Sequence, residues 1–101
     1  MFSARIDARE LRFSILEMLS RSQGYILSFD VLKGAANDVL GYGVTGDKVE
    51  TEIHWLYMQE YLDREDLKVP CAKLTEKGLE VVKGINIVPG VMPPSKCRKL
   101  G

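Results

Sequence analysis

Apolar residues along this chain recur mostly at intervals of three and four, the period of helices that bury one face. The pattern is clearest in residues 45–62, TGDKVETEIHWLYMQEYL. Its inward positions follow at spacings of four, three and four: Val49, Ile53, Leu56 and Glu60. Thr45 can cap the first turn through its hydroxyl, and Asp47 would lie near the positive end of the helix dipole. This stretch therefore predicts a helix with a defined start and one buried face.

Two further helices are predicted upstream. Residues 7–22 form the first, and Gln23-Gly24 ends it. Its apolar stripe comprises Ile6, Leu11, Ile15, Leu16, Met18 and Leu19, with Phe13 off the centre of the stripe. Residues 28–43 form the second, capped by Ser28, and its glycine Gly34 would permit close approach of a neighbouring helix. The predicted inward side of this second helix comprises Val31, Leu32, Ala35, Val39 and Leu40.

After Tyr61 the pattern changes to alternation, which is typical of strands. Residues 62–74 predict two short antiparallel strands joined by a turn at 65–68, with Pro70 marking an edge or a break in pairing. The alternating positions are Leu62, Arg64, Leu67, Val69, Cys71 and Lys73. Residues 25–27 are short and apolar, and they can add a third strand to this hairpin.

A last short helix is predicted over residues 75–84, capped by Thr75 and closed by Gly84. Residues 85–101 combine apolar positions with Pro89, Pro93 and Pro94 and show no helical period, which predicts an extended arm. An arm this apolar should pack on its own domain or on a second subunit. The predicted organisation is therefore a domain over residues 1–84 and an arm over 85–101.

The short glycine-bearing connection between the second and third helices indicates a helix-turn-helix. A generic pair of helices is the competing interpretation, but the hairpin downstream favours a winged helix-turn-helix. The predicted fold class is α+β, with a three-helix core, a small β-hairpin wing, a short C-terminal helix and the extended arm.

Length and charge narrow the possible functions. The chain has 101 residues and is 46% hydrophobic, which suits one compact domain. Its 14 basic and 14 acidic residues give a formal net charge of zero, which counts against strong non-specific affinity for DNA. No apolar run reaches the roughly 18 residues of a membrane span. The N-terminus, MFSARIDAREL, lacks the apolar core of a signal peptide, so we expect a cytoplasmic protein with no membrane partner.

The sequence gives no sign of catalysis or of a bound cofactor. It contains two cysteines and one histidine, Cys71, Cys97 and His54, which lack the spacing and the fourth ligand of a zinc site. No nucleophile, base and acid occur in a recognisable arrangement, and no glycine-rich phosphate loop is present. We therefore expect neither an enzyme nor a metal site, and no small-molecule substrate is evident.

Two motifs carry a resemblance to a known family. They are L-x-x-x-x-Y-L-D, which begins at Leu56, and K-L-T-E-K-G-L-E, which begins at Lys73. Over roughly residues 8–84 the chain resembles the winged-helix superfamily of bacterial and phage transcription factors, in which L-T-x-x-G follows the wing. More narrowly, it is similar to small winged-helix proteins of Mu-like prophages, sometimes labelled ArsR-like regulators.

This resemblance implies a DNA-binding protein, acting as a homodimer on double-stranded DNA in transcription control or phage DNA handling. Residues 45–61 would enter the major groove, and the turn at 65–68 would be the wing. The implied DNA contacts are Lys48, Thr51 and His54 in the groove, and Arg64 and Lys68 on the backbone.

The same helix is poorly equipped for DNA, because acidic side chains repel phosphates. From 45 to 61 its charges are Lys48 against Asp47, Glu50, Glu52 and Glu60. The alternative is a winged-helix module that binds another protein, since Trp and Met are enriched at interfaces. Its candidate interface comprises Trp55, Met58, Ile87, Val88, Val91 and Met92. The competing structural explanation is that the arm or the hairpin of the same domain covers the aromatic residues.

Overall fold

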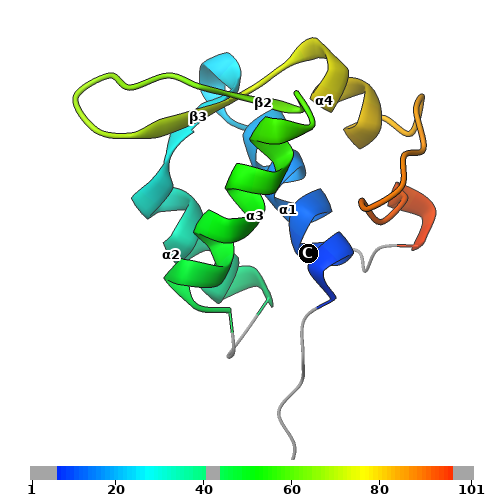
Figure 1. The fold of residues 1–101 in the computed structure, drawn as a ribbon, viewed down its shortest axis with the longest axis horizontal. Coiled ribbons are helices and arrows are strands. Elements are labelled where there is room, and N and C mark those ends of the chain that lie inside the picture. The colour runs from blue at the N-terminus through cyan, green and yellow to red at the C-terminus, as the bar shows by residue number, and fades with distance from the viewer. Residues whose placement is uncertain (1–6, 41–43, 97–101) are drawn as a thin grey trace, which may run out of the picture.

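A computed structural model describes residues 7–40 and 44–96, which form four α-helices and a three-stranded sheet (Figure 1). The α-helices are α1 (Ala8–Ser20), α2 (Phe29–Leu40), α3 (Gly46–Met58) and α4 (Glu76–Val82). The strands are β1 (Ile26–Ser28), β2 (Leu62–Arg64) and β3 (Cys71–Leu74). Two 3-10 turns, η1 (Gln23–Tyr25) and η2 (Pro94–Lys96), complete the described elements. This is the predicted α+β winged helix-turn-helix, with three helices as its core and β2–β3 as its wing.

Side-chain caps fix where the helices begin, which is why their starts could be predicted from the sequence. The cap oxygens of Ser28, Thr45 and Thr75 accept hydrogen bonds from the amides of Val31, Lys48 and Gly78, at 3.1, 3.1 and 3.0 Å. These three predicted caps are confirmed. Asp7 also caps α1, accepting a hydrogen bond of 2.9 Å from the amide of Arg9. The predicted end of the second helix at Gly41–Gly43 lies outside the described residues.

The sheet has the order β1-β3-β2, and both pairings are antiparallel. The third strand expected over residues 25–27 is therefore present, but it runs from Ile26 to Ser28 because Tyr25 belongs to η1. The wing is shorter in its strands and longer in its loop than predicted. Pro70 has no amide proton to donate, so pairing starts at Cys71, and Leu67 and Val69 lie exposed in the loop rather than in a strand.

The core lies among α1, α2 and α3 and extends under the sheet. Its fully buried large side chains are Leu11, Ile15, Leu16, Leu19, Leu32, Val49, Leu56 and Leu62. The prediction that Val49, Ile53 and Leu56 face inward is confirmed. The inward position of Glu60 is wrong, because α3 ends at Met58 and Glu60 is exposed with a positive φ of 69°.

The predicted inward side of α2 is partly wrong. Leu32 and Ala36 are buried, whereas Val31 and Val39 are among the exposed large hydrophobic residues. The helix carries two overlapping apolar stripes, one with Val31 and Val39 and one with Leu32 and Ala36. The second stripe, which contains the larger side chain of Leu32, packs into the core. Gly34 permits no close approach, since a Cβ there would meet nothing within 4 Å. On α1, Phe13 is buried rather than marginal.

The described part of the arm, residues 85–96, folds back on its own domain beside α1 (Figure 1). The amide of Met92 donates to the carbonyl of Arg9 at 3.1 Å, and the side chain of Val91 is only 3% exposed. Val88 and Met92 are partly buried against the core. Of the two packing partners considered from the sequence, the arm's own domain is the one observed. The basic end with Cys97, Arg98 and Lys99 lies outside the described residues.

Candidate nucleic-acid interface

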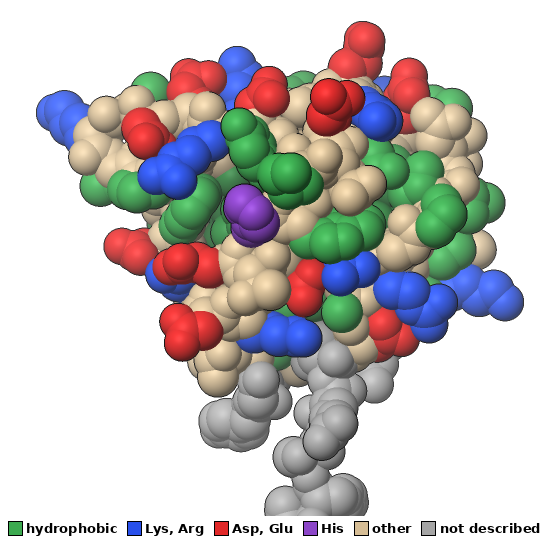
Figure 2. Space-filling view, viewed as in Figure 1, with side chains coloured by type: hydrophobic (Ala, Val, Ile, Leu, Met, Phe, Trp, Pro, Cys, Tyr) green, Lys and Arg blue, Asp and Glu red, His purple; other side chains and the backbone are tan. Residues whose placement is uncertain are grey.

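The outward face of α3 is open to solvent and lies beside the wing. Its exposed side chains are Asp47, Glu50, Thr51, His54, Tyr57 and Met58. Figure 2 shows His54 near the middle of this face, with hydrophobic side chains next to it and no described segment lying over it. The structure thus places Thr51 and His54 on the exposed face of α3.

Lys48, near the N-terminus of α3, is paired with an acidic side chain. The Nζ atom of Lys48 lies 3.6 Å from Glu52 Oε2, and the Glu52 side chain is only 4% exposed. The hydroxyl of Thr51 donates to the carbonyl of Asp47 at 2.9 Å, so it presents lone pairs rather than a proton to a ligand. Glu50 forms an ion pair with Lys33 of α2. Most of the charge on this face is therefore neutralised within the protein.

The wing carries the other two predicted DNA contacts. Arg64 Nε donates to Asp66 Oδ1 at 3.0 Å, and this bond is the main cause of a raised pKa for the Arg64 guanidinium. The same guanidinium lies 5.5 Å from the centre of the Phe29 ring. Lys68 is exposed at the loop and has no acidic partner among the described residues, so it is the cation best placed to reach a phosphate.

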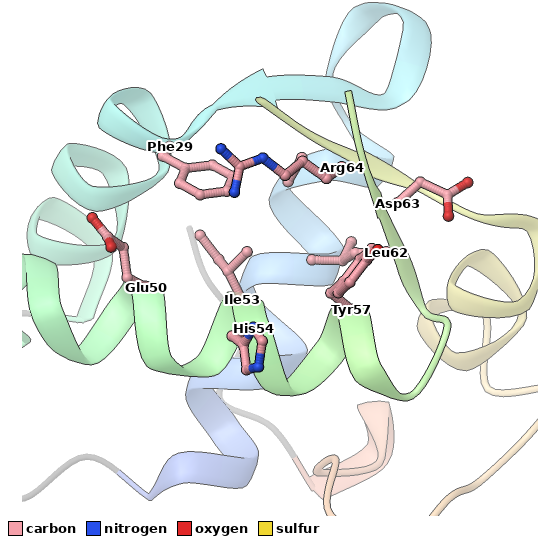
Figure 3. Close-up of a pocket in the computed structure, with 9 residues that line it drawn as sticks. Phe29, Glu50, Ile53, His54, Tyr57, Leu62, Asp63 and Arg64 are labelled. Atoms are coloured by element: carbon pink, nitrogen blue, oxygen red, sulfur yellow. The ribbon is translucent and has the colours of Figure 1, made fainter. Parts of the chain in front are cut away.

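A hollow of ≈ 350 Å³ separates α3 from the wing (Figure 3). Its floor is apolar, because Ile53, Leu62 and Ala72 line it and are buried. Its rim is formed by Phe29, Glu50, His54, Tyr57, Asp63 and Arg64. In Figure 3 the Arg64 guanidinium lies next to the Phe29 ring, whereas the Asp63 carboxylate points away from that pair. Sequence periodicity does not predict this hollow, because its lining residues come from α2, α3, β2 and β3.

A second feature that the sequence analysis missed joins α1, α3 and the arm. Arg12 donates from Nε to Glu52 Oε1 at 2.6 Å and from Nη1 to the carbonyl of Gly90 at 2.8 Å. Its guanidinium also lies 3.9 Å from the centre of the Trp55 ring. The sequence did indicate partial burial of Glu52. This residue is three positions from Val49 and four from Leu56, so it lies at the edge of the buried stripe of α3.

The residues proposed for a protein interface separate into two groups. Trp55, Val88, Val91 and Met92 pack against the core of their own domain, so the arm covers Trp55. Met58 and Ile87 are 62% and 70% exposed. Only these last two are available to a partner while the arm stays docked.

Other kinds of site have less support in the described structure. Among residues 7–40 and 44–96, no group of three or more His, Cys, Asp and Glu side chains is placed to hold a metal ion. No helix in the described ranges is long and apolar enough to cross a membrane.

Comparison with known proteins supports the fold. No family model matches the chain, and no curated protein matches its sequence. Among solved structures, it is similar to a MarR family transcriptional regulator from Streptomyces coelicolor, with a TM-score of 0.63 and 21% sequence identity. The match covers 71% of this chain and 47% of that regulator, so the chain corresponds to about half of the regulator's length. The likeness shows a shared winged-helix fold.

Proposed function

We propose that this chain is a winged-helix DNA-binding protein that acts as a homodimer in the cytoplasm, in transcription control or DNA handling. The proposal includes the narrower resemblance to small regulators of Mu-like prophages. The MarR family regulator supports it as a protein of the same fold with a regulatory role. In this proposal the chain is not an enzyme.

The observation that carries the proposal is the arrangement of α3 and the wing on one uncovered face. Thr51 and His54 point outward from α3, and Lys68 lies exposed in the wing loop. A helix presented in this way can enter the major groove while the wing contacts the backbone. Lys48, Thr51 and His54 are the proposed groove contacts, with Arg64 and Lys68 on phosphates.

The charges of this face set an upper limit on the strength of binding. To bind DNA, Lys48 must leave Glu52 for the groove and Arg64 must leave Asp66 for a phosphate. Of the three proposed cationic contacts, Lys68 alone starts without an acidic partner in the described structure. The two phosphate contacts per protomer, from Arg64 and Lys68, predict a slope of about −2 for log K against log salt. We therefore expect weak non-specific binding, with any strong binding confined to particular sequences.

Fluorescence anisotropy with a duplex enriched from a random library tests the proposal. Lys48→Ala combined with Lys68→Ala should weaken binding and reduce the salt slope by about one per protomer, because Lys68 neutralises one phosphate whereas Lys48 contacts the groove. Lys83→Ala combined with Lys96→Ala is the matched control, since Lys83 at the C-terminal cap of α4 and Lys96 in η2 are exposed away from the proposed interface. Equal losses of affinity in the two double variants, or no salt-sensitive binding by the natural chain, would contradict the proposal. Light scattering on the same samples tests the homodimer.

A second candidate function is a winged-helix module that binds another protein. The specific observation in its favour is the internal pairing of the cations beside the α3 face, with Lys33 bound to Glu50, Lys48 near Glu52 and Arg64 bound to Asp66. Tyr57 and Met58 add exposed apolar area next to these pairs. Such a surface suits a protein partner as well as it suits DNA.

A further inference from the structure

The hollow between α3 and the wing continues into a second, shallower depression on α3. This depression, of ≈ 410 Å³, is lined by Asp47, Glu50, Thr51 and His54. Glu50 and His54 line both spaces, so the two form one continuous groove. One end of the groove has an apolar floor, and the other end has a polar and acidic lining.

The apolar end can hold one large side chain. Its floor consists of Ile53, Leu62 and Ala72, which are buried at 4%, 1% and 1% exposure. The rings of Phe29 and Tyr57 form its walls. A volume of ≈ 350 Å³ lies at the small end of the range for ligand pockets, which runs from about 300 to 1,000 Å³. A bulky aromatic or aliphatic group would replace water on these surfaces.

The charge of the groove indicates which kind of molecule would carry this bulky group. The charged side chains that line the two spaces are Asp47, Glu50 and Arg64, whereas the carboxylate of Asp63 points away from Arg64 and Phe29 (Figure 3). Glu50 and Arg64 are already paired with Lys33 and Asp66. Asp47 forms no ion pair within the described residues, so the unbalanced charge of the groove is negative and lies at its polar end.

We propose that this groove binds a basic peptide segment of a partner protein, which inserts one large apolar side chain between Phe29 and Tyr57 and places a cationic side chain near Asp47. This inference deepens the second candidate function and does not depend on DNA binding. Charge complementarity selects the partner, and the apolar floor supplies an anchor point for it.

The test uses a fluorescein-labelled peptide of about twelve residues, with lysines on both sides of one phenylalanine. We expect saturable binding that weakens about tenfold when alanine replaces the phenylalanine of the peptide. The same peptide with glutamates in place of its lysines should not bind. Equal binding of the acidic and basic peptides, or no effect of removing the phenylalanine, would overturn the proposal.

Variants of the protein locate the site. Tyr57→Ala removes one wall and should weaken peptide binding about tenfold, whereas Ile87→Ala, on the exposed part of the arm, should not. Asp47→Asn combined with Glu50→Gln should weaken it three- to tenfold, by about the coupling of two exposed ion pairs, and Asp38→Asn should leave it unchanged. Thermal melts establish that each variant is folded. Equal effects of the groove variants and their controls would overturn the assignment.

The Asp47→Asn and Glu50→Gln pair also separates this inference from the proposed DNA binding. Removing two anions should strengthen binding of a DNA duplex, because less charge repels the phosphates, and should weaken binding of the lysine peptide. Stronger DNA binding with unchanged peptide binding would overturn the inference alone, whereas weaker peptide binding with unchanged or lost DNA binding would contradict only the proposed DNA contact. Self-association of the protein without peptide binding would assign the groove to a second copy of the chain and would also overturn it.

Discussion

Gly78 shows how a single residue of the L-T-x-x-G motif supports the fold. A Cβ at this position would overlap the carbonyl oxygen of Tyr61 and lie 2.8 Å from a methyl carbon of Leu74. Thr75 completes the same junction, because its hydroxyl donates to the carbonyl of Glu60 at 2.8 Å and its amide donates to that of Tyr61 at 3.2 Å. The motif therefore fastens the start of α4 to the end of α3, which explains why it accompanies this fold.

Two glycine substitutions test this explanation with opposite expected signs. Gly78→Ala should lower the free energy of unfolding by about 2–3 kcal/mol, because overpacking against the backbone outweighs the better helix propensity of alanine. Gly34→Ala should raise it by up to about 1 kcal/mol, since its added Cβ lies in open space on α2. Urea denaturation of both variants measures the difference. A stabilised Gly78→Ala variant would show that α4 does not pack this closely.

Asp7 allows a prediction about pH. Its hydrogen bonds from Arg9, first from the side chain and then from the backbone, lower the pKa of the Asp7 carboxyl below its usual value of 3.8. A lowered folded-state pKa means that the interaction stabilises the fold above about pH 4 and is lost as the pH falls through the folded value. Because the pair is largely exposed, Asp7→Ala should cost only about 1 kcal/mol, mainly through removal of the helix cap.

Denaturation curves at neutral and low pH check this prediction. The difference in stability between the natural chain and Asp7→Ala should shrink as the pH falls below about 4, because the natural carboxyl then gains its proton. Thr75→Ala is a suitable comparison, since it also removes a helix cap but has no titratable group. A pH-independent difference for Asp7→Ala would contradict the ionic part of this account.

At the scale of elements, the arm is a structural part of the domain. Gly90 lies directly against Trp55, where a Cβ would approach two ring carbons at 2.6 and 2.7 Å. Arg12 fills the space beside them, bonded to both Glu52 and the Gly90 carbonyl. Because Glu52 is buried, loss of Arg12 would leave its carboxylate with Lys48 alone, at 3.6 Å.

The packing of the arm on Trp55 can be tested with matched glycines. Gly90 and Gly84 both have positive φ, 90° and 77°, but a Cβ at Gly84 would meet Pro94 only at an ordinary 3.7 Å. Gly84→Ala should therefore cost about 1 kcal/mol for its backbone conformation, and Gly90→Ala about 1–3 kcal/mol more for the clash. Gly90→Ala should also shift the fluorescence of the single tryptophan. Equal costs and an unchanged spectrum would show that the arm does not cover Trp55.

Sequence patterns predicted the elements well where the information was local. The caps at Ser28, Thr45 and Thr75 and the buried stripe of α3 are set by residues within a few positions of one another. Patterns failed where two solutions competed, as in the overlapping stripes of α2. They also failed for long-range interactions, because Arg12 and Glu52 are separated by 40 positions and no period connects them.

At the scale of the whole molecule, no other described segment covers the face formed by α3, the wing and the groove between them (Figure 2). The sequence predicted the location of this face through Thr51, His54 and Lys68. It could not predict the groove, because four separate elements line it. It also could not show that the cations of this face are paired within the protein. The Lys33–Glu50 pair depends on how α2 packs on α3, and the Arg64–Asp66 pair depends on the conformation of the wing loop.

Amide chemical shifts in a two-dimensional ¹⁵N–¹H NMR spectrum test the central claim most directly, that the α3 and wing face binds DNA. Adding a duplex enriched from a random library should shift the amides of residues 45–58 and 62–74 and leave those of 76–96 in place. Shifts confined to α4 and the arm, or no shifts at low salt, would contradict the account.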